Sequence, residues 1–387
     1  MLQHTLTLIW NRKGKNALMI AEIFFAFLIL FSVLTFVLYN LNNYREPLGF
    51  ETNQLWLSHL EFDGRDSLEV VQTKKNLKQT LLEKSQIKGI AFSSDNSPFG
   101  SSHSTHISKN NGFYLESDLY VADIDFKEVV DVKLVGGRWF TVEDKQSKYP
   151  PLIINKKLHD TYFNGQPILD SIRQIGPEGK IVGIVEHFKY KGQFEEEVSL
   201  TFLYRPKEHE ESNTIYFRLA EGVGLEFEEE LTNSILQIGK FSDVYIEQIE
   251  NRRNRANKST WIPMVALLSI CGFLIFNVAL GLFGVLWYNI SKRKAEIGLR
   301  RTLGAFKSTI ALQFITEIVV VAMVGILLGV LFGVQVPLLS DLDIAPTFFY
   351  QAIGLSALLI FFLVVICAVY PSQQAARIAP AIALHEE

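Results

Sequence analysis

Four stretches of the chain are apolar over enough residues to cross a membrane as helices. Each exceeds the roughly 18–20 residues that a bilayer core of about 30 Å requires. They cover residues 17–41, 261–288, 308–334 and 350–370. The first is longer than the roughly 7–15 apolar residues of a signal peptide, and no small-residue cleavage site follows it, so we expect it to be retained. The pattern predicts four transmembrane helices.

Between the first two apolar stretches, residues 42–258 alternate between short β-branched runs and amphipathic runs. Strands are expected at 53–61, 87–92, 113–121, 124–126, 152–154, 180–185, 199–204, 214–219 and 242–246. Helices are expected at 67–84, 127–135, 156–162 and 224–238, and a loop at 93–111. The helix over 67–84 would bury Leu68, Val71, Leu77, Leu81 and Leu82. This alternation predicts an α+β domain, split by an insertion.

Polar runs flank the apolar stretches on the side of this domain. Residues 247–260 are compatible with a helix, and residues 39–45 continue the first stretch in the same way. We expect both runs to extend the spans as a stalk. The predicted spans are 17–41, 261–288, 308–334 and 350–370, and the outer domain with its stalk is 42–258. The remaining segments are an amphipathic cytoplasmic N-terminus (1–16), a basic cytoplasmic loop (289–307), an outer loop (335–349) and a cytoplasmic tail (371–387).

Charge sets the expected orientation. Lys and Arg gather before the first stretch and in the loop at 289–307, whereas the loop at 335–349 has none and carries Asp341 and Asp343. The positive-inside rule therefore predicts cytoplasmic N- and C-termini, with the α+β domain on the outer side of the membrane. The two cysteines, Cys271 and Cys367, lie in apolar stretches, so the outer domain must fold without disulfides.

The sequence offers little catalytic chemistry. It has no phosphate-cradling G-x-x-x-x-G-K-[ST] loop and neither a G-x-S-x-G nor an H-E-x-x-H motif. His103 and His106 have a spacing that could chelate a metal on a helix, but they lie in a Ser-rich stretch where a solvated loop is expected. We therefore expect a non-catalytic chain with no metal or cofactor of its own, and no nucleic-acid partner.

Three polar residues lie inside apolar stretches: Glu22, Gln313 and Glu317. Intramembrane carboxylates can form a proton relay. We favour the alternative that Glu22 and Glu317 lie in the cytoplasmic leaflet, with Gln313 hydrogen-bonded to Glu317 from one turn back. Separately, the third stretch contains a doubled G-x-x-x-G, formed by Gly325, Gly329 and Gly333. Such glycines let another helix approach closely, within the chain or between chains.

The basic loop has a pattern that orientation alone does not explain. Positive-inside bias accounts for its Lys and Arg, but an apolar stripe also recurs there at helical spacing. The stripe consists of Leu299, Leu303, Phe306 and Ile310. A two-faced helix of this kind lies in the membrane interface or docks in a protein groove.

This segment and the tail resemble those of MacB/FtsX-type ABC transporter permeases. The matching residues of the loop and the next span are Glu296, Ile297, Gly298, Arg300, Arg301, Leu303, Gly304, Ala305, Gln313 and Glu317. Leu299 of the stripe lies among them. Those of the tail are Pro371, Ala375, Ala376, Pro380, Ala383 and Leu384. Weaker matches occur at 135–140 and 181–185.

The resemblance implies a MacB-like extracytoplasmic core domain, with a porter-like α/β module and an inserted β-rich subdomain. It implies a bacterial inner (cell) membrane, and a coupling helix at residues 291–305 whose residues 296–305 contact a cytoplasmic ABC ATPase. That ATPase would be a separate subunit that binds ATP and Mg, since only residues 1–16 precede the first span. Two permease protomers, identical or related, would transmit ATP-driven movement to the outer domains (mechanotransmission), together with an adaptor or outer-membrane channel.

Export or extraction of a substrate is the expected function. The alternatives are a signalling actuator that regulates an outer partner such as a cell-wall hydrolase, and an ATPase-independent membrane receptor or scaffold.

Overall fold

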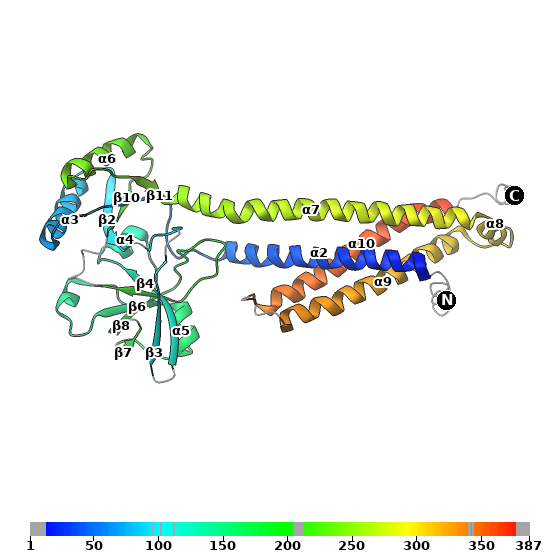
Figure 1. The fold of residues 1–387 in the computed structure, drawn as a ribbon, viewed down its shortest axis with the longest axis horizontal. Coiled ribbons are helices and arrows are strands. Elements are labelled where there is room, and N and C mark those ends of the chain that lie inside the picture. Colours follow the sequence, from blue (N-terminus) through cyan, green and yellow to red (C-terminus); the bar gives the residue numbers. More distant parts are fainter. Residues whose placement is uncertain are drawn as a thin grey trace. The chain divides into compact units, whose positions relative to one another are not determined.

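The computed structural model describes residues 13–94, 96–100, 103–110, 113–175, 177–204, 213–339, 342 and 344–376. The chain forms two compact units, a helical unit (Met1–Leu41 with Trp261–Glu387) and an α/β domain (Asn42–Thr260), whose elements are drawn in Figure 1. Several residues singled out above lie outside the described part: those before residue 13, Asp341 and Asp343, and Pro380, Ala383 and Leu384 of the tail.

Within the described residues, four helices are long and apolar enough to cross a membrane, as predicted. They are α2 (Lys13–Arg45), α7 (Ile249–Lys292), α9 (Lys307–Leu339) and α10 (Pro346–Ala376). Two of them include the polar runs that flank the apolar stretches. α7 is one continuous helix of 44 residues, and α2 continues to Arg45.

The α/β domain begins and ends with one four-stranded antiparallel sheet, in the order β11-β1-β10-β2. Its elements are β1 (Leu55–His59), α3 (Ser67–Leu82), β2 (Ile87–Ser93), β10 (Thr214–Leu219), α6 (Glu226–Gly239) and β11 (Ile246–Gln248). The chain therefore follows a β-α-β-β-α-β path, a ferredoxin-like arrangement that is interrupted between β2 and β10. Leu77 of α3 and Leu231 of α6 pack with Phe217 in the core beneath the two helices.

The interruption folds as a second, mixed sheet in the order β3-β4-β9-β6-β8-β5, with β7 paired to β8. Its strands are β3 (Thr105–Asn110), β4 (Phe113–Val121), β5 (Leu134–Gly137), β6 (Pro151–Asn155), β7 (Ile172–Gln174), β8 (Glu178–Val185) and β9 (Leu200–Leu203). Its helices are α4 (Phe126–Val130), the 3-10 turn η1 (Val142–Gln146) and α5 (Lys156–Phe163). An aromatic core joins both sheets, and in it the hydroxyls of Tyr120 and Tyr216 lie 2.9 Å apart. The expected α+β domain with an insertion is confirmed.

Several local expectations were wrong. The stretch 93–111 contains β3, because its polar residues pair with β4 over a full strand. Residues 124 and 125 form a bend and Phe126 begins α4, which ends at Val130 because Asp131 adopts a left-handed backbone (φ 60°). The chain then pairs with β8 as β5 instead of continuing as a helix to residue 135. The last strand, β11, begins at Ile246 instead of spanning 242–246.

The buried face of α3 also differs from the expected one. Leu77 and Leu81 are buried as predicted, but Leu68, Val71 and Leu82 are exposed by 82%, 46% and 41%. Val70 and Lys74 take their places on the buried face. The buried face of α3 is therefore rotated relative to the face predicted from its apolar residues, and Lys74 lies inside the domain.

Asp123, between β4 and α4, gives the α/β domain an unusual pH dependence. Burial raises the pKa of this carboxyl to about 7, against an ordinary value of 3.8, although Lys78 opposes the shift. Between these values the folded chain holds a proton that the unfolded chain has released. The contribution of Asp123 to stability therefore falls as pH rises through this window, by up to about 1.4 kcal/mol per pH unit, and is lowest above pH 7.

We expect Asp123→Asn to remove this loss, because the amide cannot ionise and its oxygen can still accept the hydrogen bond from the Phe92 amide. The gain in stability should be small at pH 5 and largest at pH 8. Urea unfolding of the full chain would measure it, followed by the fluorescence of buried Trp139, whose indole donates to the Asp123 carbonyl. Equal pH dependence in the variant and the wild type would contradict the assignment.

Candidate functional site

The basic loop folds as a short helix, α8 (Lys294–Thr302), between α7 and α9. It ends in a tight reversal at Gly304, which has a φ of 90° that disfavours side chains with a Cβ. The Gly304 amide donates to the Arg301 carbonyl (3.2 Å), and the Ala305 amide donates to the Arg300 carbonyl (3.0 Å). This pair of bonds is a Schellman C-cap. The L-G-A part of the sequence motif is therefore the stop signal of α8.

A buried arginine fastens the start of α8 to α9. The side chain of Arg293 is 8% exposed, and its guanidinium donates to Glu296 Oε2 (2.7 Å) on α8 and to Glu317 Oε2 (2.8 Å) on α9. Its Cζ also lies 5.0 Å from the ring centroid of Phe314. A charge this deeply buried is stable only when it is paired, and here two carboxylates pair with it.

The same carboxylates complete a closed network. Arg300 donates to Glu296 Oε1 (2.5 Å) and to Gln313 Oε1 (2.8 Å), and Gln313 donates in turn to Glu317 Oε1 (3.0 Å). We name these five residues the base network: Arg293, Glu296, Arg300, Gln313 and Glu317. It joins the end of α7, the length of α8 and the first turns of α9, so that these three elements are held together by charge-assisted hydrogen bonds.

The apolar residues of α8 divide between a buried and an exposed set. Ile297 is 2% exposed and packs with Ile290, Ile310, Phe314, Ala375 and Ala376 from the adjoining helices. Leu299, Leu303 and Phe306 are 55%, 80% and 77% exposed. The expected four-residue helical stripe is therefore wrong, because α8 ends before Leu303 and the reversal at Gly304 places Phe306 in the connection to α9 and Ile310 on α9, where Ile310 is buried. The remaining three form an exposed surface, which we name the apolar tip (Leu299, Leu303 and Phe306).

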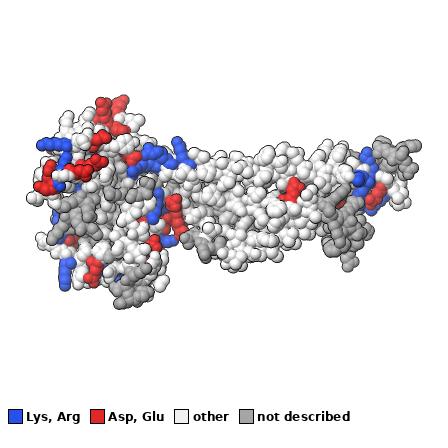
Figure 2. Space-filling model, in the orientation of Figure 1, with Lys and Arg blue, Asp and Glu red and all other residues white. Residues whose placement is uncertain are grey.

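Charge is concentrated near this part of the helical unit. On the face drawn in Figure 2, most of the helical unit is uncharged, and basic and acidic side chains gather at the end that carries α8. Arg301 is half-buried and donates to the Ala305 carbonyl (3.0 Å), so part of its role is to brace the cap. Gly298 is buried beside Ile297.

The remaining candidate residues pack within the chain. A Cβ on Gly329 would lie 2.4 Å from the Phe27 ring, and one on Gly325 would lie 2.9 Å from Ile23, so these two glycines face α2. One on Gly333 would lie 3.2 Å from Ile353 of α10. Glu22 of α2 packs against Gly281 of α7, because a Cβ on Gly281 would lie 2.6 Å from the Glu22 carboxylate.

A second polar site, which the sequence did not reveal, lies within the α/β domain. Residues 186–199, which join β8 to β9, contact the polar ends of both α2 and α7; we name them the clamp segment. The buried ammonium of Lys189 donates to the carbonyls of Asn43 (2.7 Å) and Gln193 (3.3 Å). Desolvation lowers the pKa of this ammonium, and nearby Glu46 opposes the shift.

Gln193 connects the two helix ends directly. Its amide nitrogen donates to the Tyr44 carbonyl of α2 (3.2 Å). Its amide oxygen accepts from Arg253 Nε (2.9 Å) and Asn257 Nδ2 (3.2 Å) of α7. Because Gln193 is 7% exposed, these bonds are sheltered from water. One side chain of the clamp segment thus ties two helices that are far apart in the sequence.

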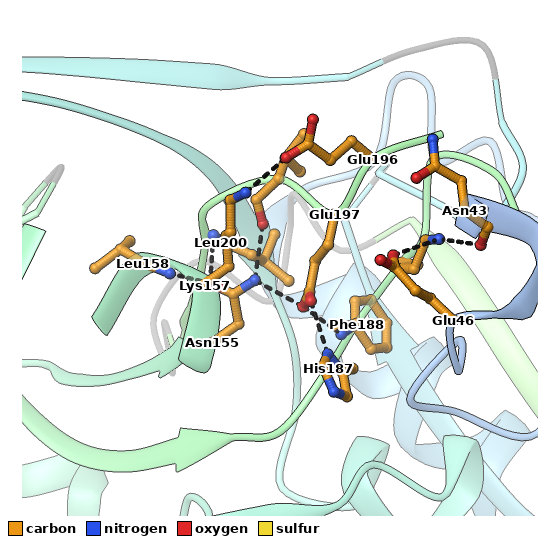
Figure 3. A network of polar contacts seen from close by, with 12 residues as sticks. Asn43, Glu46, Asn155, Lys157, Leu158, His187, Phe188, Glu196, Glu197 and Leu200 are labelled. Atoms are coloured by element: carbon orange, nitrogen blue, oxygen red, sulfur yellow. Dashed lines mark hydrogen bonds and ion pairs between the residues drawn. The ribbon is translucent and has the colours of Figure 1, made fainter. Parts of the chain in front are cut away.

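The clamp segment is itself braced against the second sheet, as Figure 3 shows. Glu197 accepts from the Phe188 amide and from Asn155 (both 3.0 Å), and its other oxygen lies 2.8 Å from His187 Nδ1. Asn155 is fully buried and its oxygen also accepts from the Leu200 amide (3.0 Å). The clamp segment therefore has one set of hydrogen bonds to the helix ends and a separate set to the inserted sheet, and its backbone connects the two.

Comparison with known proteins supports the resemblance seen in the loop. Residues 268–380 match the family described as FtsX-like permease C-terminal. The chain is 25% identical over 292 residues to an uncharacterized ABC transporter permease, YvrN of Bacillus subtilis strain 168, covering 70% of each protein. It is 24% identical over 275 residues to the macrolide export ATP-binding/permease protein MacB of Bartonella quintana, covering 68% of this chain but only 41% of that protein.

Among solved structures, the periplasmic region of MacB from Actinobacillus actinomycetemcomitans matches 55% of this chain and 97% of its own, with a TM-score of 0.38 and 15% identity. The family match covers α8, α9, α10 and most of α7, which include the base network and the apolar tip. The chain is therefore a multi-pass membrane protein that contains an FtsX-like permease domain and is similar to ABC transporter permeases of the MacB/FtsX type.

Proposed function

We propose that this permease couples ATP hydrolysis by a separate cytoplasmic ABC ATPase to movement of its α/β domain on the outer side of the cell membrane. The observation that carries the proposal is the construction of α8. The base network and the Schellman cap fix the helix firmly to α7 and α9, yet its apolar tip is exposed. A helix that is held firmly in place and exposes apolar residues beside basic groups is suited to dock against a partner protein.

The connection between α8 and the outer domain would be mechanical. α7 is one 44-residue helix, about 66 Å long at a rise of about 1.5 Å per residue, and Arg293 lies directly after its last residue. A displacement of α8 would therefore move α7 as a lever. The sequence places only two acidic residues, Glu22 and Glu317, in the four predicted spans, which favours force transmission over a hydrophilic tunnel.

The outcome of this movement would be export or extraction of a substrate from the outer side of the membrane. Two permease protomers would act with the ATPase, which would hold ATP and Mg, and both chain termini would be cytoplasmic. An adaptor or outer-membrane channel would then receive the substrate in an organism with two membranes. The export function named for the MacB relative supports this proposal by similarity.

The docking step can be tested on the apolar tip. We expect Leu303→Asp combined with Phe306→Ser to reduce ATPase association and permease-dependent stimulation of ATP hydrolysis by about tenfold or more, as loss of two interface anchors would. The purified ATPase and full-length permease in nanodiscs would supply both measurements. Val142→Ser, which changes a residue of the α/β domain that is 62% exposed, is the control. Full stimulation by the double variant would rule out docking through α8.

A further inference from the structure

The α/β domain contains a cavity of about 300 Å³ that the proposed coupling does not use. It lies where α3 of the ferredoxin-like part meets the β4–α4 connection, η1 and the end of β9 in the inserted part. Its volume is at the lower end of the range for sites that bind small molecules. Apolar side chains, including Phe92 and Ile124, form part of the lining.

Four lysines line this cavity, three from α3 and one from η1: Lys74, Lys75, Lys78 and Lys145. Against them stand two carboxylates, Asp123 and Asp125. Lys78 forms an ion pair with Asp125. Lys74 is 5% exposed, and its ammonium lies 5.1 and 5.7 Å from the ring centroids of Phe62 and Phe92. The cavity wall therefore carries an excess of positive charge, part of it buried among aromatic rings.

Asp123 provides an independent sign of a ligand. It is 8% exposed, and one carboxyl oxygen accepts from the Phe92 amide at 2.9 Å. The other oxygen, Oδ1, is buried and has no hydrogen bond of normal geometry among the described residues, although the Phe126 amide is near enough to the carboxyl to lower its pKa slightly. A buried polar atom without a partner costs free energy, and it is expected where a ligand group completes the site.

We propose that this cavity binds a small organic anion, with its carboxylate or similar oxyanion among the lysines and its apolar body against Phe92 and Ile124. The Asp123 carboxyl, in its neutral form, donates a hydrogen bond from Oδ1 to the oxyanion. Burial raises the pKa of Asp123 to about 7, which favours the proton that this bond needs. The site does not involve α8 and is independent of ATPase docking.

The first test measures binding of benzoate to the full-length chain in nanodiscs at pH 6 by calorimetry, with neutral benzamide for comparison. We expect benzoate to bind at least tenfold more tightly than benzamide. Lys75→Glu with Lys145→Glu reverses two exposed charges of the lining and should weaken benzoate about tenfold. Lys88→Glu reverses an exposed charge on β2 away from the cavity and should have little effect. Equal binding of benzoate and benzamide, or equal losses in both lysine variants, would overturn the proposal.

The second test examines the proton on Asp123. The charged or titratable groups that line the cavity with it are Lys74, Lys75 and Lys78 of α3, Asp125 before α4, Lys145 of η1 and Tyr204 after β9. Benzoate affinity of the wild type should fall as pH rises from 6 to 8, because the ionised carboxylate repels the anion. Asp123→Asn keeps a donor toward the cavity at every pH, so its affinity should stay constant. A parallel decline in both proteins would show that Asp123 does not contact the ligand.

Discussion

Replacing Arg293 with methionine is expected to detach α8 from α9 and to produce the largest loss of stability in the helical unit. The substitution keeps an apolar stem but leaves Glu317, which is 21% exposed, and Glu296 without their central cation. Removing one partner of a buried ion pair costs on the order of 3–5 kcal/mol, mostly because the remaining charge stays unpaired. In the proposed function, α8 would then move relative to α9 when the ATPase changes conformation. ATP hydrolysis would continue without movement of the α/β domain.

Thermal unfolding of the full chain in detergent would measure the loss of stability. Lys292→Met is the control, because Lys292 is the exposed neighbouring cation and lies over the Tyr288 ring instead of in the base network. Adding Glu317→Gln to Arg293→Met should restore part of the stability, since it removes the unpaired carboxylate. Equal stability of the Arg293 and Lys292 variants would contradict the role given to the base network.

The sequence predicted the position of α8 but not how it is held. Positive-inside bias explains every Lys and Arg of the loop, so Arg293 looked like one surface cation among six. Only the fold brings Glu317, 24 positions along the chain, within 2.8 Å of it. A signal was nevertheless present, because Glu296 and Glu317 are acidic residues in segments where acids are otherwise rare. Long-range pairing of this kind is not encoded in local periodicity.

In the α/β domain, periodicity predicted the strands with strong β-branched patterns, such as β6 and β8. It missed strands that form only because a neighbouring strand pairs with them. β3 carries polar residues and exists because β4 lies beside it. Leu68 and Val71 fit a helical stripe, yet the position of α3 on its sheet turns them outward and Lys74 inward. Tertiary packing decides which face of a helix is buried when several apolar residues surround it.

The clamp segment was invisible in the sequence for a similar reason. Lys189 and Gln193 are ordinary polar residues of a connection between strands, where exposure is the usual expectation. Their importance arises from burial against Asn43 and Tyr44, roughly 145 to 150 positions earlier in the chain. The structure thereby adds a second site at which movement of the helices could be transmitted.

Lys189→Met is expected to loosen the end of α2 within the α/β domain. The variant leaves the Gln193 carbonyl buried without its donor, at a cost of about 1–3 kcal/mol, and the Asn43 carbonyl keeps only the longer bond from the Glu46 amide (3.3 Å). Glu46 is 44% exposed and can be solvated, so its loss of a partner adds little. Because Gln193 also ties α7, the disturbance should extend to Arg253 and Asn257 but not to α8.

Hydrogen–deuterium exchange of the full chain would show this as faster exchange of the amides at residues 42–46 and 253–257. Lys180→Met, which removes an ion pair with Asp170 at the domain surface, is the matched control and should leave these amides unchanged. In the reconstituted complex, the Lys189 variant should retain ATPase stimulation while transport falls, because docking at α8 is intact and only the connection to the inserted sheet is weakened. Loss of both ATPase stimulation and transport would instead indicate that the clamp segment supports the fold of the whole chain. Slow exchange at residues 42–46 in the variant would contradict the proposal that Lys189 holds the end of α2.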